Sequence, residues 1–149
     1  MGLAQEVEIL KRIPLFANID PAKLKLMCFA SERMTFKDNE VICRQGETGD
    51  SAFIILDGSA DVQVDSPDGP MSVATLTKND IVGEIAILCD VPRTATVAAK
   101  GELVTLKVTK EFFFSMIKDF PEIAVEIMRV LAHRLEVTTR ELLAARAGN

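Results

Sequence analysis

The sequence contains no tryptophan, no tyrosine and a single histidine, His133. Without tryptophan or tyrosine, an aromatic cage around a cation or a base is not expected. One histidine disfavours the cupins, metal-dependent enzymes on small β-barrels, because such ions are usually held by several imidazoles. The three cysteines, Cys28, Cys43 and Cys89, form no Cys-x-x-Cys pair, so neither a disulfide framework nor a zinc site is predicted. We expect a protein that is not an enzyme and that holds no metal ion or other cofactor.

Long hydrophobic runs and excess positive charge are also missing. No apolar run approaches the roughly 18 residues of a membrane-spanning helix, and the first residues lack the features of a secretory signal. The 22 acidic residues outnumber the 17 basic ones, which gives a net charge of −5. Binding to a phosphate backbone draws on a basic face, so a nucleic-acid partner is disfavoured. We expect a cytoplasmic protein without a membrane segment and without a nucleic-acid partner.

The composition is that of a packed domain, with 48% hydrophobic and 26% charged residues in 149. Periodicity divides the chain into helices over 1–30, strands over 31–108 and helices over 109–149. In the middle part, short β-branched runs alternate with turn-forming clusters, a pattern typical of antiparallel barrels and sandwiches. These clusters are residues 36–39, 45–50, 57–58, 66–70 and 77–80. We predict one α+β, mainly β, domain over 1–149: an antiparallel jelly-roll barrel flanked by N-terminal helices and a C-terminal helix pair.

Start signals locate the helices. Asp20 followed by Pro21 combines an N-cap carboxylate with a proline at the first helical position. Thr109 is a predicted N-cap for a short helix, and Pro121 begins a long helix that reaches about Ala147. Apolar residues at helical spacing along the long helix indicate one buried stripe.

One segment of the middle part, residues 81–97, does not fit strands and turns alone. Gly83 and Glu84 open a short apolar run with helical character, and Arg93 follows it. Glycine lets the backbone approach a ligand closely because it has no Cβ. The first N–H groups of a helix, here those of Ile85 and Ala86, are unpaired donors at the positive end of the helix dipole. Together with the guanidinium of Arg93, which suits a phosphate, they predict an anion site.

This segment resembles the phosphate-binding cassette of cyclic-nucleotide-binding domains, the module of kinase regulatory subunits, nucleotide-gated channels and catabolite-activator-type regulators. The family pattern is aliphatic-Gly-Glu-x-small-aliphatic, then a spacer, then Arg-(Ser/Thr/Ala)-Ala-x-aliphatic. Residues 82–87 (VGEIAI) and 93–97 (RTATV) meet it at every position, which places the cassette and its short helix at 82–97. The upstream glycines of the family are matched by Gly46, Gly49 and Gly58.

The resemblance implies a cyclic nucleotide as the ligand and a role for each matching residue. Glu84 would accept a hydrogen bond from the ribose 2′-hydroxyl. Arg93 would pair with the exocyclic oxygens of the cyclic phosphate, beside Gly83. The backbone N–H groups that would assist it are those of Ile85, Ala86 and Ala95. The family positions that line the sugar and base pocket correspond to Val62, Val64, Val73 and Val82. A simpler alternative is a buried ion pair between Glu84 and Arg93, which could also form in the empty site.

Thr94 bears on the choice of nucleotide. In the kinase branch of the family, a hydroxyl-bearing residue just after the arginine is associated with binding of cyclic GMP, because the hydroxyl can form a hydrogen bond with the guanine amino group. Bacterial and channel members with serine or threonine at this place use cyclic AMP. The resemblance therefore favours cAMP over cGMP. A plain alternative is a strand threonine that bonds its own backbone.

The resemblance also implies a lid. In the family the C-terminal helix closes over the base, hinged here near Phe120 and Pro121, with Ile85 in contact with the hinge. No aromatic residue follows Phe120, so the capping side chains would be aliphatic or cationic. The candidates for capping are Leu131, Arg134 and Leu135. We expect His133 at the surface.

These observations predict a cyclic-nucleotide sensor that closes its C-terminal helix over the ligand. Two other classes stay open: a ligand-free member of the family that acts only as an interaction domain, and a cupin-like metal enzyme, which the single histidine disfavours. No kinase, channel or DNA-binding segment is present in the 149 residues. We therefore expect either an unknown protein effector in trans or an output domain that this chain lacks.

Overall fold

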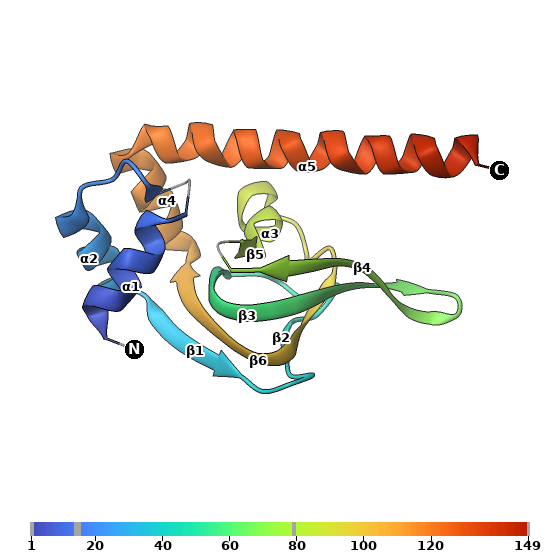
Figure 1. The fold of residues 1–149 in the computed structure, drawn as a ribbon, viewed down its shortest axis with the longest axis horizontal. Coiled ribbons are helices and arrows are strands. Elements are labelled where there is room, and N and C mark those ends of the chain that lie inside the picture. Colours follow the sequence, from blue (N-terminus) through green and yellow to red (C-terminus); the bar gives the residue numbers. More distant parts are fainter. Residues whose placement is uncertain (1, 14–15, 79, 149) are drawn as a thin grey trace.

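The computed structural model describes residues 2–13, 16–78 and 80–148, apart from the side chain of Ile85. Figure 1 shows a curled sheet with α1, α2 and α4 at one end and the long α5 running along one side. In chain order the elements are α1 (Leu3–Lys11), α2 (Pro21–Ala30), β1 (Glu32–Phe36), β2 (Val41–Cys43), β3 (Ser51–Ser66), β4 (Gly69–Thr77), β5 (Ile81–Val82), α3 (Glu84–Cys89), β6 (Thr96–Thr109), α4 (Lys110–Asp119) and α5 (Pro121–Ala147).

The two longest strands, β3 and β6, form the centre of the sheet and pair from Ser51 opposite Thr109 to Gln63 opposite Thr96. The strand order is β1-β6-β3-β4, with β2 paired to β6 and β5 paired to β3, all antiparallel. Over the described residues the hydrogen-bonded ladder does not close between β1 and β4, and the sheet curls into a barrel-like jelly roll (Figure 1). The predicted fold class, including the flanking helices and the short helix of the cassette, is confirmed.

The turn predicted at residues 57–58 is wrong. β3 runs through both residues, and its register against β6 shifts between Ile55 and Asp57 and again between Asp57 and Ser59. Gly58 takes a φ of +91°, which lets the strand bulge without reversing its direction. Because a bulge bends a strand and increases its twist, this irregularity contributes to the curl of the sheet.

The predicted helix starts are confirmed by their caps. The carboxylate of Asp20 accepts a hydrogen bond from the N–H of Ala22 at 2.9 Å. The hydroxyl of Thr109 accepts one from the N–H of Phe112 at 3.2 Å. Phe120 lies between α4 and α5, as the C-cap of the first and the N-cap of the second, so the predicted break between the two C-terminal helices lies where the sequence indicates it.

The first part of β3, residues 51–56, is buried on both faces, as its continuous apolar run requires. Ala52, Ile54 and Leu56 join a core formed with α1, α2, α4 and the start of α5. Phe53 and Ile55, which alternate with them, face the second core inside the barrel. The sheet is therefore fixed to the helices on one side and encloses its own interior on the other.

Helix α5 is attached to the rest of the molecule through its first half. Ile123 and Ile127 are buried in the helical core, whereas residues 135–148 are all exposed. Figure 1 shows this exposed part, which we call the free half of α5, extending in the same direction as the tip of the β3–β4 hairpin. None of the helices in the described chain is long and apolar enough to cross a membrane.

Candidate functional site

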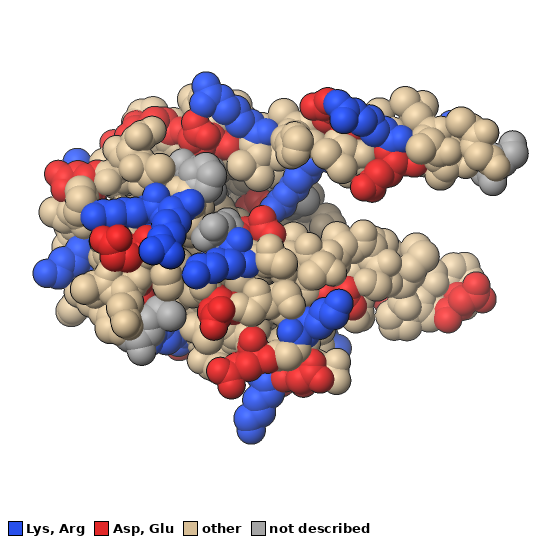
Figure 2. Space-filling model, in the orientation of Figure 1, with Lys and Arg blue, Asp and Glu red and all other residues tan. Residues whose placement is uncertain are grey.

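A cavity of about 590 Å³ opens between the curled sheet, the β5–β6 connection (residues 83–95) and α5. The β5–β6 connection contributes Gly83, Glu84, Ala86, Arg93, Thr94 and Ala95 to its wall. The strands contribute Cys43, Val62, Val73, Ala74, Leu76, Ile81, Val82 and Val97. Helix α5 contributes His133, Arg134, Val137, Thr138 and Glu141. Figure 2 shows the molecule hollowed between the free half of α5 and the hairpin, and the cavity volume is in the range of small-molecule sites.

Two glycines make room for the side chain of Arg93. Gly83, the N-cap of α3, takes a φ of +85°, and a Cβ on it would collide with Nη1 of Arg93. A Cβ on Gly49 would lie 2.7 Å from Cζ of Arg93 and 2.8 Å from Cβ of Ala86. A side chain at either glycine would displace the guanidinium, so both glycines are needed for the observed position of Arg93.

Arg93 is a buried cation, with 8% of the residue exposed. Its guanidinium donates to the carbonyl oxygen of Gly83 at 3.0 Å and to that of Ser51 at 2.8 Å. Its N–H donates to the carbonyl of Glu47, and its carbonyl accepts from the N–H of Gly46, both at 2.8 Å. No carboxylate of the described residues lies within 4 Å of the guanidinium. A buried cation without a counter-charge is unfavourable, so this end of the cavity suits an anion.

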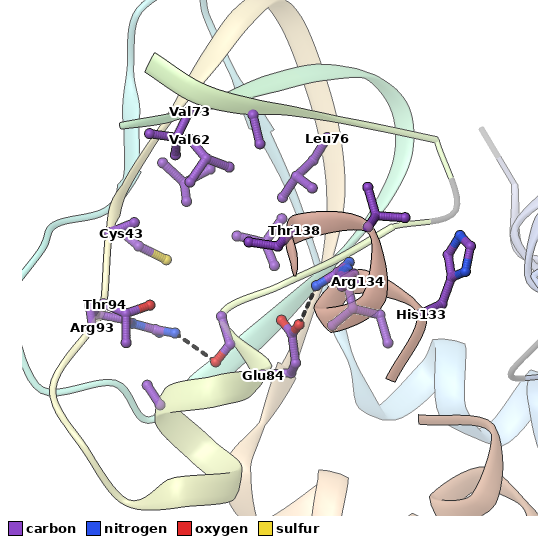
Figure 3. Close-up of a pocket in the computed structure, with 18 of the residues that line it drawn as sticks. Cys43, Val62, Val73, Leu76, Glu84, Arg93, Thr94, His133, Arg134 and Thr138 are labelled. Atoms are coloured by element: carbon purple, nitrogen blue, oxygen red, sulfur yellow. Dashed lines mark hydrogen bonds and ion pairs between the residues drawn. The ribbon is translucent and has the colours of Figure 1, made fainter. Parts of the chain in front are cut away.

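Glu84 forms an ion pair with α5. Its Oε1 accepts from Nη1 of Arg134 at 2.6 Å, and 8% of the Glu84 side chain and 36% of the Arg134 side chain are exposed. An ion pair between Glu84 and Arg93, the alternative drawn from the sequence, is wrong, because the Arg93 guanidinium donates to the carbonyls of Gly83 and Ser51 and Glu84 pairs with Arg134. Figure 3 shows the contacts with Gly83 and Arg134 as dashed lines. The Glu84–Arg134 pair therefore joins the β5–β6 connection directly to α5.

Most of the residues selected from the sequence come together at this cavity. Those that line it are Val62, Val73, Val82, Gly83, Glu84, Ala86, Arg93, Thr94, Ala95 and Arg134. Val64 lies two residues farther along the hairpin, opposite Met71, and does not line it. Leu131 packs against the helical core and Leu135 is 68% exposed, so neither lines the cavity. The side chain of Ile85, expected at the hinge, lies outside the described part of the structure.

The sequence analysis missed part of the wall. Val137, Thr138 and Glu141 follow Arg134 at three, four and seven positions and so share its side of α5, a spacing that could have identified them. His133 is exposed, as expected, and Figure 3 shows it at the outer edge of the cavity. The missed strand residues are Cys43, Ala74, Leu76, Ile81 and Val97. Alternation along a strand gives its two faces but does not say which one encloses a ligand.

The cavity is polar at one end and apolar at the other. Glu84 and Arg93 lie at one end, and Val62 and Leu76 lie at the other (Figure 3). Burial raises the pKa of the Cys43 thiol, and the positive charge of Arg93 opposes this rise only in part. No group of three His, Cys, Asp or Glu among the described residues is placed to hold a metal ion. The arrangement suits a ligand with an anionic end, a hydroxyl donor for Glu84 and an apolar body.

Known proteins have sequences similar to this one. Residues 33–120 match the family model "Cyclic nucleotide-binding domain". The CRP-like cAMP-activated global transcriptional regulator of Mycobacterium tuberculosis is 29% identical over 136 residues, which cover 91% of this chain and 61% of the regulator. The cAMP-dependent protein kinase regulatory subunit of Blastocladiella emersonii is 32% identical over 115 residues, which cover 76% of this chain and 28% of that subunit. The chain thus spans less than two thirds of the length of either relative.

A solved structure shares the fold. The catabolite activator protein of Thermus thermophilus superposes with a TM-score of 0.77 at 24% identity, over 87% of this chain and 61% of that protein. The family match covers more than half of the chain, and it includes the whole β5–β6 connection with Gly83, Glu84 and Arg93. This chain therefore belongs to the cyclic nucleotide-binding domain family.

Proposed function

We propose that the chain binds a cyclic nucleotide in the cavity beside Arg93, as a regulatory sensor rather than an enzyme. The observation that carries this proposal is the buried Arg93 guanidinium, which donates to two carbonyls and has no carboxylate of the described chain beside it. A cyclic phosphate carries one negative charge, and its exocyclic oxygens match the planar fork of a guanidinium. A guanidinium has five N–H donors, so it can bind phosphate oxygens in addition to the two carbonyls.

The same geometry leaves room for the ribose at Glu84. Oε1 of Glu84 binds Arg134, and a carboxylate has a second oxygen that can accept a hydrogen bond from a 2′-hydroxyl. The proposed ligand can therefore bind without breaking the link between Glu84 and α5. The first N–H groups of α3, which have no partner within the helix, would assist Arg93 at the phosphate.

For the base, we propose contacts with the apolar end of the cavity and a preference for cAMP over cGMP. Val62 and Val73 offer apolar contacts, and Thr94 and Thr138 bring hydroxyl groups to the cavity wall. The two relatives described above are named for cAMP, one as a cAMP-activated regulator and the other as a cAMP-dependent kinase subunit. The preference rests on these relatives and on the position of Thr94 next to Arg93.

Calorimetric titrations of cAMP, cGMP and 5′-AMP, side by side, test the proposal. We expect saturable binding of cAMP, weaker binding of cGMP, and much weaker binding of 5′-AMP, whose open phosphate is larger and carries a second charge. If neither cyclic nucleotide binds at millimolar concentration, where even a free energy of about −4 kcal/mol would be detected, the proposal is rejected. Tighter binding of cGMP would reject the preference alone.

The Glu84–Arg134 ion pair favours one other candidate, a family member that works without a ligand. In such a member α5 would be held against the β5–β6 connection by this pair alone, because it already neutralises the buried carboxylate. The two candidates predict different occupants of the space beside Arg93. In a sensor this space binds an anion, whereas in a ligand-free member it contains only water. The titrations above separate them.

We also propose that α5 is the lid of the site. Saturating cAMP should slow amide hydrogen exchange in α5 around residues 134–141, because a base beneath Val137 and Thr138 adds contacts to a stretch that is otherwise exposed. Exchange in α1, at the far end of the molecule, serves as the internal control (Figure 1). Equal exchange in α5 with and without cAMP would speak against the lid.

Occupancy of the site would be relayed in the cytoplasm to a protein effector or to an output domain outside this chain. This proposal is supported by the relatives, a transcriptional regulator and a kinase regulatory subunit, of which the chain matches 61% and 28%. The exposed free half of α5 lies next to the site and offers a surface to either kind of output.

A further inference from the structure

The loop between β2 and β3, residues 44–50, holds the backbone of Arg93. The N–H of Arg93 donates to the carbonyl of Glu47, and the carbonyl of Arg93 accepts from the N–H of Gly46, both at 2.8 Å. Gly49, in the same loop, leaves space for the guanidinium, because a Cβ there would lie 2.7 Å from Cζ of Arg93. The position of this loop therefore determines where the guanidinium enters the cavity.

Gln45 connects this loop to two strands. Its backbone N–H donates to Oγ1 of Thr96, the first residue of β6, at 3.0 Å. Its side-chain Oε1 accepts from the N–H of Asp65, near the end of β3, at 2.9 Å. No other hydrogen bond in the described part of the chain joins the loop to the β3–β4 hairpin, residues 59–77. The link between loop and hairpin therefore depends on one side chain.

The side chain of Gln45 takes the place of a strand that has ended. β3 pairs with β6 as far as Gln63 opposite Thr96, where β6 begins. Backbone groups two residues apart point to the same edge of a strand, so the N–H of Asp65 points to the edge at which β6 is no longer present. Gln45 accepts the hydrogen bond that a longer β6 would have accepted. Figure 1 shows the hairpin tip extending beyond the other strands, so this hydrogen bond lies at the base of the projecting part.

The hairpin and Arg93 belong to opposite ends of the cavity. The hairpin contributes Val62, Val73 and Leu76 to the apolar end, and Arg93 lies at the polar end (Figure 3). The two residues that hold the backbone of Arg93 directly follow Gln45 in the chain. Gln45 therefore links the two ends of the cavity through a short, hydrogen-bonded path.

We propose that Gln45 is a positioning residue of the nucleotide site, which holds the hairpin and Arg93 at a fixed separation. The inference rests on the proposed function, in which one ligand contacts both ends of the cavity. Ordering a loose part of a site on binding costs free energy, so a link that orders it beforehand strengthens binding. Gln45 does not line the cavity, so it acts through the hairpin and Arg93 rather than by touching the ligand.

The test is the cAMP affinity of Gln45→Met, measured by calorimetry. Methionine has nearly the length of glutamine but no oxygen to accept the hydrogen bond from Asp65. We expect the affinity to fall about three- to tenfold, the loss expected for one hydrogen bond of ordinary strength. Gln63→Met is the matched control, because the Gln63 side chain donates to Asp61 at 2.9 Å and does not line the cavity. The control should leave the affinity unchanged.

A double-mutant cycle distinguishes positioning from a purely structural role. In a chain that already carries Arg93→Lys, Gln45→Met should have a smaller effect on the affinity, because no guanidinium is left to position. All titrations are made at a temperature at which thermal unfolding shows every variant to be folded, so lower stability alone leaves the affinity unchanged. Amide exchange at Asp65, followed by NMR, should be faster in Gln45→Met than in the original chain.

The proposal is overturned if Gln45→Met binds cAMP as tightly as the original chain, or if Gln63→Met loses as much affinity. It is also overturned if the effects of Gln45→Met and Arg93→Lys are additive. Gln45→Asn, whose amide is one methylene shorter, replaces Gln45→Met if that variant does not fold. Failure of the original chain to bind either cyclic nucleotide would reject the proposed function itself, so the two failures are distinguishable.

Discussion

Replacing Arg93 with alanine should weaken cAMP binding at least about tenfold and leave the protein folded. A tenfold loss corresponds to about 1.4 kcal/mol, whereas a single hydrogen bond to a charged group contributes roughly 1.5–3 kcal/mol. Tenfold is therefore the smallest loss that the proposed phosphate contact allows. The fold should tolerate the change because two effects oppose each other: a buried cation without a counter-charge is removed, while the carbonyls of Gly83 and Ser51 lose their donor.

Calorimetry measures the affinity, and Arg129→Ala is the matched control. Arg129 is on α5, its side chain is 71% exposed, and it does not line the cavity, so its loss should leave the affinity unchanged. Arg93→Lys keeps the charge but loses the planar fork, and its affinity should lie between those of the original chain and Arg93→Ala. A folded Arg93→Ala variant that binds cAMP as tightly as the original chain would falsify the assignment of Arg93 to the phosphate.

Replacing Gly58 with alanine should lower the free energy of unfolding by about 3 kcal/mol. An L-residue at a left-handed backbone position costs roughly 1–2 kcal/mol, and Gly58 has a φ of +91°. A Cβ at this position would also collide with the carbonyl oxygen of Glu102 on β6. That oxygen belongs to the backbone of a strand paired with β3, so it cannot move aside without disturbing the centre of the sheet.

Gly46→Ala separates the two contributions. Gly46 has nearly the same conformation, with a φ of +88°, but a Cβ on it would meet no atom within 4 Å. We expect it to cost only the conformational part, about 1–2 kcal/mol. Urea unfolding of both variants gives the difference directly. Equal losses at the two glycines would show that β6 yields to the added methyl group and that the contact with Glu102 does not constrain the bulge.

The features predicted correctly from the sequence depend on near neighbours along the chain. Asp20 and Thr109 cap their helices through N–H groups two and three residues away, which a local pattern can indicate. The β5–β6 connection is likewise a continuous stretch, so Gly83, Glu84 and Arg93 could be identified from their spacing. The alternation of residues 61–65 correctly predicted that Val62 lines the cavity. Val64 is on the same face of the strand but lies beyond the cavity.

The features that were not predicted depend on contacts between distant parts of the chain. Glu84 and Arg134 are 50 positions apart, and nothing near either residue indicates that they pair. The side of α5 that faces the cavity depends on how the helix is rotated when it packs, and the choice of Leu131 and Leu135 followed a different stripe. Gly58 looked like a turn because glycine serves both turns and bulges, and only the pairing of β3 with β6 distinguishes them.

The attachment of α5 through its first half has a mechanical consequence. A helix of 27 residues is about 40 Å long, and this one packs against the core through Ile123, Ile127 and Leu131 and is paired with Glu84 through Arg134. A tilt of about 10° at Phe120 would move Arg134, roughly halfway along, by about 3–4 Å and the far end by about 7 Å. The helix therefore has the proportions of a lever arm, which delivers at its tip about twice the displacement that occurs above Glu84.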